Sequence, residues 1–226
     1  MSQTKIIGGG VVSPGVEWGL DPTFQAAHIS LRPFDYAQFG QVLGHYRISG
    51  TAVGQLWGAN AILFNIRWGD PSRFFVLQRL SAIVTTTSAI TAQRIDPLSA
   101  TVQRGYTAGE TTLLGNIVPT GNTGKARINM GSSLVSQMNV TSGPAGLSGG
   151  TRTADNTSFA LLPVNGLGAA GTATQMDDFV RADQFGMHPL VLSTNEGITV
   201  SWGATALATG LATFTIIVSW AEVVVF

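Results

Sequence analysis

The sequence predicts an all-β protein: a jelly-roll-like antiparallel β-sandwich with an extended N-terminal arm. Three observations favour this fold class. Short stretches of alternating apolar and polar residues recur, turns rich in Gly separate them, and no stretch sustains the 3.6-residue period of an amphipathic helix. Many short strands with such turns are typical of a sandwich or barrel, and about ten strands suit a jelly roll.

Residues 1–40 lack this alternation. They contain several Gly and Pro residues and the scattered aromatic residues Trp18, Phe24 and Phe34. We therefore expect an extended arm over residues 1–40 and a β-sandwich over residues 41–226. Two arrangements of the arm remain open: it lies on a neighbouring subunit, or it packs on its own domain.

Two strands are expected in the first half of the sandwich. Large apolar side chains alternate with polar ones over residues 62–68, which predicts a strand with one buried face. A Gly-Asp-Pro-Ser turn follows, and residues 74–87 then end in β-branched side chains. Phe74, Leu77 and Leu80 stand at helical spacing, so a short helix is open for the first half of that segment, but we favour a strand.

The C-terminal region shows the clearest alternation, over residues 198–202 and 213–220. The Gly/Ala/Thr stretch between them predicts an antiparallel hairpin with a long loop. Residues 197–221 carry no charge and are long enough to span a bilayer, but Ser and Thr interrupt them with period two. We therefore expect no membrane span.

Shorter strands and long loops complete the expected domain. The remaining strands are expected at residues 44–49, 100–106, 126–130, 134–141, 158–163 and 189–193. Loops rich in Gly, Thr, Ser and Ala are expected at residues 114–125, 143–156 and 166–177.

The charge of the chain favours assembly. Only 11% of residues are charged, against about 25% in ordinary soluble domains, and the net charge is zero. Ten of the twelve cationic residues are Arg, the residue favoured where protein surfaces meet, and two are Lys. The zero balance argues against nucleic acid as a partner, and the absence of Cys excludes disulfides and thiolate metal sites.

One segment matches an enzyme motif. Residues 146–150 (Gly-Leu-Ser-Gly-Gly) fit the nucleophile-elbow pattern, with Ser148 as the nucleophile. Candidate triad partners follow in the hydrolase order: Asp177, Asp178 or Asp183, then His188. An elbow requires a strand, a strained turn and a helix, and the residues after Gly150 do not predict a helix. We therefore interpret the match as a loop.

A second glycine motif and the metal-ligand residue types lead to similar conclusions. Residues 166–171 fit the dinucleotide pattern but lack a surrounding βαβ unit, so a loop is expected. His28, His45 and His188 have no metal spacing, and a hydrogen-bonded His45 is expected in a strand. The acidic residues Asp177, Asp178 and Asp183 fit no calcium loop. We assign no catalytic, cofactor-binding or metal-binding residue.

Tryptophan side chains could stack on sugars. Trp68, Trp202 and Trp220 lie on the apolar faces of expected strands, which places them in the core. Trp57 lies in a Gly-flanked loop and stays open as a sugar-binding side chain.

Four segments carry a resemblance: Gly-His-Tyr-Arg-Ile-Ser-Gly (44–50), Arg-Trp-Gly-Asp-Pro-Ser-Arg-Phe (67–74), Asn-Glu-Gly-Ile (195–198) and Val-Ser-Trp-Ala-Glu-Val (218–223). From about residue 43 to the C-terminus, the chain resembles poorly characterised proteins of tailed-bacteriophage and metagenomic phage genomes. The resemblance implies a virion structural protein and supplies no catalytic residues.

We therefore expect a capsid decoration or cement protein on the phage head, not an enzyme. Its partners would be further copies of itself, for example in a homotrimer, and the phage major capsid protein, with no nucleic acid, membrane or cofactor. Two alternatives remain: another virion component (tail, fibre, connector or shell subunit), or a carbohydrate-binding host-attachment module with exposed aromatic side chains around Trp57.

Overall fold

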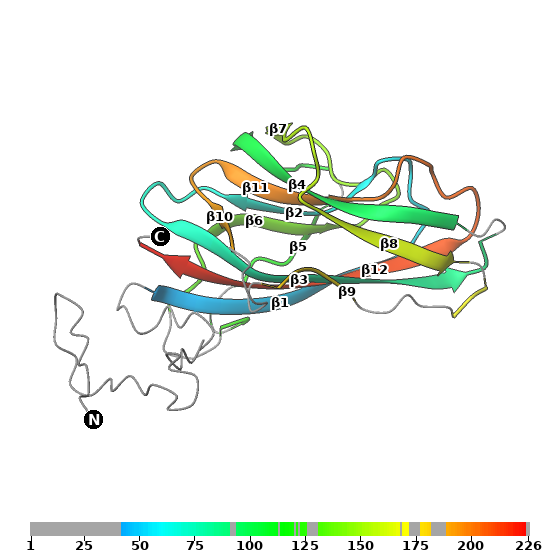
Figure 1. The fold of residues 1–226 in the computed structure, drawn as a ribbon, viewed down its shortest axis with the longest axis horizontal. Helices are drawn as coiled ribbons and strands as arrows, with labels where there is room; N and C mark the ends of the chain where they lie inside the picture. The colour runs from blue at the N-terminus through cyan, green and yellow to red at the C-terminus, as the bar shows by residue number, and fades with distance from the viewer. Residues whose placement is uncertain are drawn as a thin grey trace, which may run out of the picture. The chain divides into compact units, whose positions relative to one another are not determined.

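The computed structural model contains two antiparallel β-sheets packed face to face, which confirms the all-β sandwich (Figure 1). It describes residues 42–90, 94–112, 114–119, 121, 123–125, 131–167, 169–171, 177–181 and 189–224, and these contain no helix. The expected arm over residues 1–40 and the expected strand over residues 126–130 lie outside the described residues.

The first sheet contains three long strands. Its order is β1 (Val42–Gln55), β12 (Leu211–Val223), β3 (Phe74–Ser88) and β10 (Leu190–Leu192). A short strand, β9 (Asp177–Arg181), also pairs with β3. The whole of residues 74–88 is extended, so the strand expected there is confirmed and the helical alternative is wrong.

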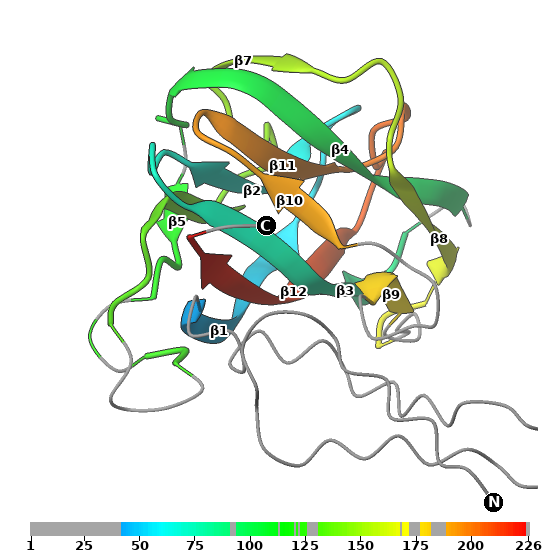
Figure 2. The ribbon, with the colours of Figure 1, turned by 60° about the vertical axis from the view of Figure 1, so that its left-hand side comes forward.

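The second sheet forms the other layer (Figure 2). Its order is β5 (Leu114–Asn116), β6 (Val135–Thr141), β2 (Ile62–Trp68), β11 (Glu196–Ser201), β4 (Arg94–Ala108) and β7 (Thr151–Ala154). Strand β8 (Ala160–Leu167) also pairs with β4. Strands β5 and β7 lie within segments that the sequence predicts as loops.

The hairpin expected near the C-terminus is wrong. Strand β11 pairs with β2 and β4 in the second sheet, whereas β12 pairs with β1 and β3 in the first. Residues 203–210 therefore cross from one layer to the other instead of turning back within a sheet. Both strands still bury their apolar sides in the same core, which is why their alternation looks alike.

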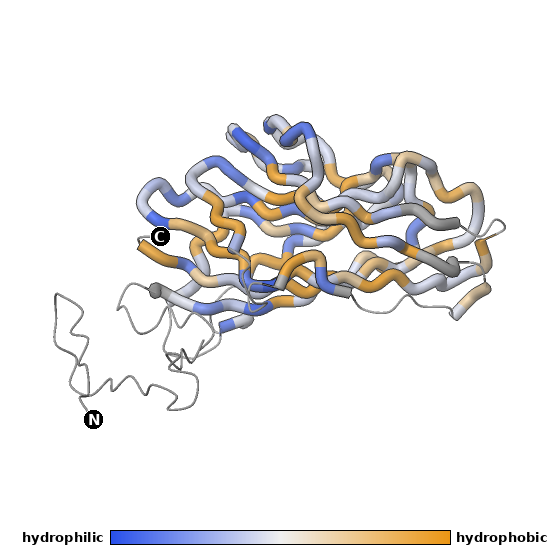
Figure 3. The backbone as a smooth tube through the Cα atoms, viewed as in Figure 1, coloured by the Kyte–Doolittle hydropathy of each residue, from blue (hydrophilic) through white to orange (hydrophobic). Residues whose placement is uncertain are grey.

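Aromatic side chains fill much of the space between the layers. Trp220 stacks on Phe75 on one side and on Tyr46 on the other, with ring centroids 5.6 and 5.4 Å apart. Trp57 packs against Trp202, 5.2 Å away. The core positions predicted for Trp68, Trp202 and Trp220 are confirmed. Figure 3 shows the apolar residues alternating with polar ones along the strands, as a sandwich with one buried face per sheet requires.

Candidate functional site

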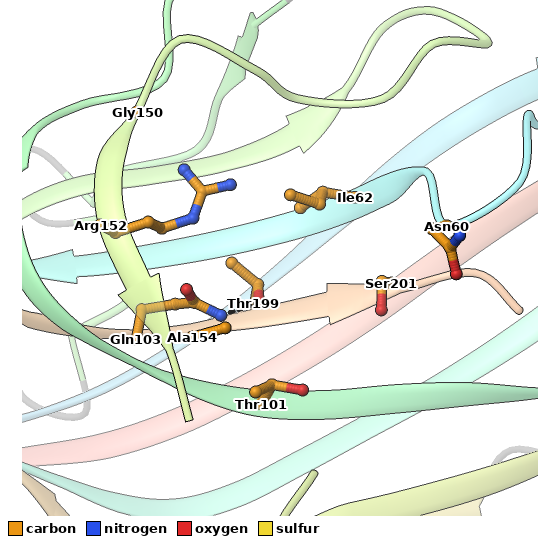
Figure 4. Close-up of a pocket in the computed structure, with 9 residues that line it drawn as sticks. All are labelled: Asn60, Ile62, Thr101, Gln103, Gly150, Arg152, Ala154, Thr199 and Ser201. Carbon is orange, nitrogen blue, oxygen red and sulfur yellow. Dashed lines mark hydrogen bonds between the residues drawn. The ribbon is translucent and has the colours of Figure 1, made fainter. Parts of the chain in front are cut away.

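A polar groove of about 370 Å³ lies on the outer side of the second sheet (Figure 4). Strands β4 and β11 form its floor and β7 forms one wall. Most of the side chains that line it are uncharged and can form hydrogen bonds: Asn60, Thr101, Gln103, Thr199 and Ser201. Ile62, Gly150, Arg152 and Ala154 complete the lining.

Strand alternation positions the floor. Val102 and Ile198 face the core, so their neighbours Thr101, Gln103 and Thr199 face the groove. The side-chain amide of Gln103 donates a hydrogen bond of 2.7 Å to the hydroxyl of Thr199. Both side chains are almost fully buried although they lie on the outer face of the sheet. The segment that carries β7 therefore covers part of this polar face, and the groove lies between that segment and the floor.

Arg152 holds the wall in place. Its guanidinium forms an ion pair with Glu110, whose side chain is fully buried, and lies 5.2 Å from the centre of the Tyr106 ring. The Tyr106 hydroxyl donates a 2.6 Å hydrogen bond to Glu110 and accepts one from Asn65. Burial, followed by the hydrogen bond to Glu110, raises the pKa of the Tyr106 hydroxyl well above its usual value. Tyr106 therefore stays protonated and acts as a donor to the carboxylate.

Gln137 and Gly150 complete this network. The Gln137 side chain accepts a hydrogen bond from the backbone N–H of Glu110 and donates one to its carbonyl, at 2.8 and 2.9 Å. The N–H of Gly150 donates to the Glu110 carboxylate at 3.3 Å. A side chain at Gly150 would collide with Arg152. The network links β7 and the turn after β4 to strands β2 and β6 of the same sheet.

The arrangement can bind a polar ligand by hydrogen bonds. The charge of Arg152 is balanced by Glu110, so the lining presents no net charge. The hydroxyl and amide groups of Thr101, Ser201 and Asn60 can each donate and accept. Among the described residues, no cluster of three or more His, Asp or Glu side chains could hold a metal ion.

The nucleophile-elbow segment adopts another geometry. Ser148 is exposed, and its backbone carbonyl accepts hydrogen bonds from the N–H groups of Thr111 and Thr112 at 2.9 and 3.2 Å. Strand β7, not a helix, follows the segment. The strand–turn–helix of an elbow is thus missing at Ser148.

Of the candidate triad and calcium-binding residues, the structure describes the side chain of Asp178. Asp178, on β9 of the first sheet, accepts hydrogen bonds from Arg79 at 2.8 Å and from Ser81. The structure thus gives this carboxylate a structural pairing on the sheet opposite to Ser148. Asp183 and His188 lie outside the described residues, as does the side chain of Asp177.

Two other candidate motifs have ordinary surroundings. In the dinucleotide-like segment, Gly166 belongs to β8, while Gly168 and the residues that should begin a helix lie outside the described residues. His45 lies on β1, as expected, and its Nδ1 is 3.3 Å from the amide nitrogen of Gln78. His28 lies outside the described residues.

Trp57 belongs to the core rather than to a sugar site. Its side chain is fully buried and packs against Trp202 and Phe214. The carbohydrate-binding alternative therefore loses the exposed aromatic side chain on which it depended. The sequence offered no periodic pattern around Trp57, because that residue lies between strands.

Sequence reasoning missed a buried carboxylate in the core, Glu222. Oε1 of Glu222 accepts hydrogen bonds from the Ser133 hydroxyl, the Leu134 N–H and the Trp220 indole N–H, at 2.7, 3.0 and 3.2 Å. Burial raises the pKa of Glu222 above its usual value, although these hydrogen bonds oppose the shift. Its even position on β12, in phase with Val218 and Trp220, is the signal that could have placed it inward.

Comparisons with known proteins found no match to the chain among protein-family models, curated proteins or solved structures. Within the described residues, no helix has the length and apolar character needed to cross a membrane.

Proposed function

We propose that this protein is a structural component of a bacteriophage virion, most specifically a capsid decoration or cement protein that self-associates and contacts the major capsid protein. The observation that carries the proposal is the nearly uncharged outer face of the first sheet. Among the outward side chains of its long strands β1, β3 and β12, the charged ones are Arg47 and Arg79, and Arg79 is paired with Asp178.

Small hydroxyl and β-branched side chains cover much of the rest of this face. Cross-strand partners include Thr51 with Thr215 and Thr213 with Thr85. Antiparallel strands with short side chains form an even surface, and such a surface packs against another without displacing long charged side chains. Exposed apolar side chains, Val53 and Leu211, lie where β1 ends and β12 begins. Together these features favour contact with a second protein surface.

Assembly on a capsid requires no strong single contact. Burying apolar area contributes about 25 cal/mol per Å², and many weak contacts in a closed lattice reinforce one another. The low charge and the Arg preference of the chain reduce repulsion between copies. In this proposal, residues 1–40 form an arm that reaches across a seam between capsid subunits.

Light scattering coupled to size exclusion tests self-association. We expect the purified chain to form a stable small oligomer or larger particles. Val53→Glu should shift the protein toward monomer, because it places a charge on the proposed contact face at a side chain that is already 66% exposed. Thr153→Glu, on an exposed position of β7 in the second sheet, is the matched control and should leave the mass unchanged. A monomer at every concentration would contradict the proposal.

Co-sedimentation with capsids tests the role in the virion. Deleting residues 1–40 should abolish attachment to capsids of the encoding phage while leaving the circular dichroism spectrum of the sandwich unchanged. Full decoration by the truncated chain would rule out the arm. Copy number in purified virions separates the alternatives: hundreds of copies favour decoration, and a few to a dozen favour a tail, fibre or connector component.

A further inference from the structure

We propose that the polar groove on the second sheet binds a neutral saccharide. The inference does not depend on a virion role, because the groove and the proposed assembly face belong to different sheets. It gives the carbohydrate-binding alternative a basis that does not involve Trp57.

The size and lining of the groove define the class of ligand. Its volume of about 370 Å³ falls within the range of small-molecule sites, about 300–1,000 Å³. Ile62 and Ala154 are the apolar side chains in the lining, and no aromatic side chain lines the groove on which an aromatic ligand could stack. The remaining side chains are hydroxyls, amides and one arginine, which match a ligand rich in hydroxyl groups.

Electrostatics separates a sugar from charged ligands. The one cation in the lining, Arg152, already donates to Glu110 and lies over Tyr106. A phosphate or carboxylate ligand would have to compete with a buried carboxylate for that guanidinium, and a cation would meet it as a like charge. A neutral polyol avoids both costs and can still accept a hydrogen bond from Arg152.

The floor offers polar groups with unused hydrogen-bonding capacity, on the buried Gln103 and the half-buried Thr101 and Ser201. Gln103 uses its amide N–H on Thr199, and among the described residues its amide oxygen has no partner. The hydroxyls of Thr101 and Ser201 each make one hydrogen bond, to Ser158 and Ser99. A hydroxyl supports one donated and up to two accepted hydrogen bonds, so each retains capacity for a ligand. Polar groups placed at fixed positions in a pocket in this way can select a ligand by its hydrogen-bonding pattern.

Asn60 gives the groove a feature that can be tested cleanly. It has a positive φ of 54° and an exposed side chain at the rim. Glycine adopts this backbone conformation freely, so Asn60→Gly removes the amide without straining the turn. Thr101→Val removes a hydroxyl from the floor and keeps the β-branched shape. The matched control is Thr51→Val, the same change at an exposed position of β1 in the first sheet.

Saturation-transfer-difference NMR on the full chain provides the test, because it remains usable for large assemblies. The probes are glucose, galactose, mannose, N-acetylglucosamine, maltose and lactose, each free and as its methyl glycoside. A preference for the glycosides would indicate the end of a glycan chain as the natural ligand, and equal binding would indicate a free sugar. Inorganic phosphate and glucose 6-phosphate serve as charged counter-probes.

We expect at least one neutral probe to bind, and to bind about five- to tenfold more weakly to Asn60→Gly and Thr101→Val but equally well to Thr51→Val. Absence of transfer to every neutral probe at millimolar concentration would overturn the proposal. Binding that persists unchanged in both groove variants, or tighter binding of glucose 6-phosphate than of glucose, would overturn it as well. None of these outcomes changes the expected assembly, so the two proposals fail separately.

Discussion

The carboxylate of Glu110 and the guanidinium of Arg152 form an ion pair almost completely removed from water. The side chain of Glu110 is fully buried and that of Arg152 is only 12% exposed. Tyr106 donates a hydrogen bond to the same carboxylate and lies under the guanidinium. This pair of charges therefore links β7 to the turn after β4 and shapes one wall of the groove.

Arg152→Met should lower the free energy of unfolding by about 3–5 kcal/mol, because it leaves the buried Glu110 carboxylate without its partner. Urea denaturation measures the change. Arg104→Met is the matched control: Arg104 is half exposed and pairs with Asp155 and Glu196, so its loss should cost no more than about 1 kcal/mol. Adding Glu110→Gln to Arg152→Met should restore part of the loss. Equal effects of the two Arg substitutions would contradict a buried pair.

Glu222 should make stability depend on pH in an unusual direction. Burial raises the pKa of its carboxyl above the ordinary 4.5, so the folded protein holds this proton more tightly than the unfolded chain does. The contribution to stability is therefore fully present below about pH 4.5 and is lost as pH rises through the higher folded pKa. Urea midpoints measured from pH 4.5 upward should show this loss.

Glu222→Gln isolates that effect. Because Ser133, Leu134 and Trp220 all donate to Oε1, a glutamine oxygen can accept the same hydrogen bonds without titrating. The difference in unfolding free energy between the glutamine variant and the wild type should grow with pH in favour of the variant. A difference that stays constant across this range would show that the carboxyl is not titrating with a raised pKa.

Trp57 and Trp220 should respond differently to replacement by phenylalanine. Both are fully buried, but the indole N–H of Trp57 has no hydrogen-bond partner among the described residues, whereas that of Trp220 donates to Glu222. Trp220→Phe therefore leaves a carboxylate under-satisfied and should cost about 1–3 kcal/mol more than Trp57→Phe. Thermal and urea denaturation of the two variants compare them directly. The reverse order would contradict the described hydrogen bonding.

Trp57→Ala should cost about 3–5 kcal/mol, because it leaves a cavity beside Trp202 and Phe214. A loss of ligand binding in this variant would therefore result from the loss of folded protein and would not show that Trp57 contacts the ligand. The groove variants Asn60→Gly and Thr101→Val avoid that ambiguity, since they remove polar groups outside the core.

Alternation along the strands predicts which side chains face the core, but not which strands are neighbours. Trp202 follows β11 and Phe214 lies on β12, and both point into the same core from opposite sheets. Two consecutive strands show the same alternation whether they pair within one sheet or face each other from opposite sheets. Alternation therefore cannot decide whether β11 and β12 form a hairpin. The groove could not be predicted from the sequence for a related reason. Alternation places Gln103 and Thr199 on an outer face, and only the path of a distant segment covers them.

The four segments that carry the phage resemblance pair two by two, with one pairing in each sheet. Residues 44–50 of β1 pair with residues 216–222 of β12, and Trp68 of β2 lies opposite Glu196 of β11. These segments are therefore explained by packing.

A close backbone approach in the second sheet gives a final prediction, at Gly197. A Cβ atom added there would collide with the backbone carbonyl oxygen of Ile66 on the neighbouring strand β2 and would crowd the Tyr106 ring. Gly197→Ala should therefore lower the free energy of unfolding by about 1–3 kcal/mol, as overpacking does. Gly131→Ala is the control, because open space surrounds that position. It should be neutral or slightly stabilising, since alanine restricts the unfolded chain. Urea denaturation separates the two, and equal stability of both variants would show that β2 and β11 can move apart at little cost.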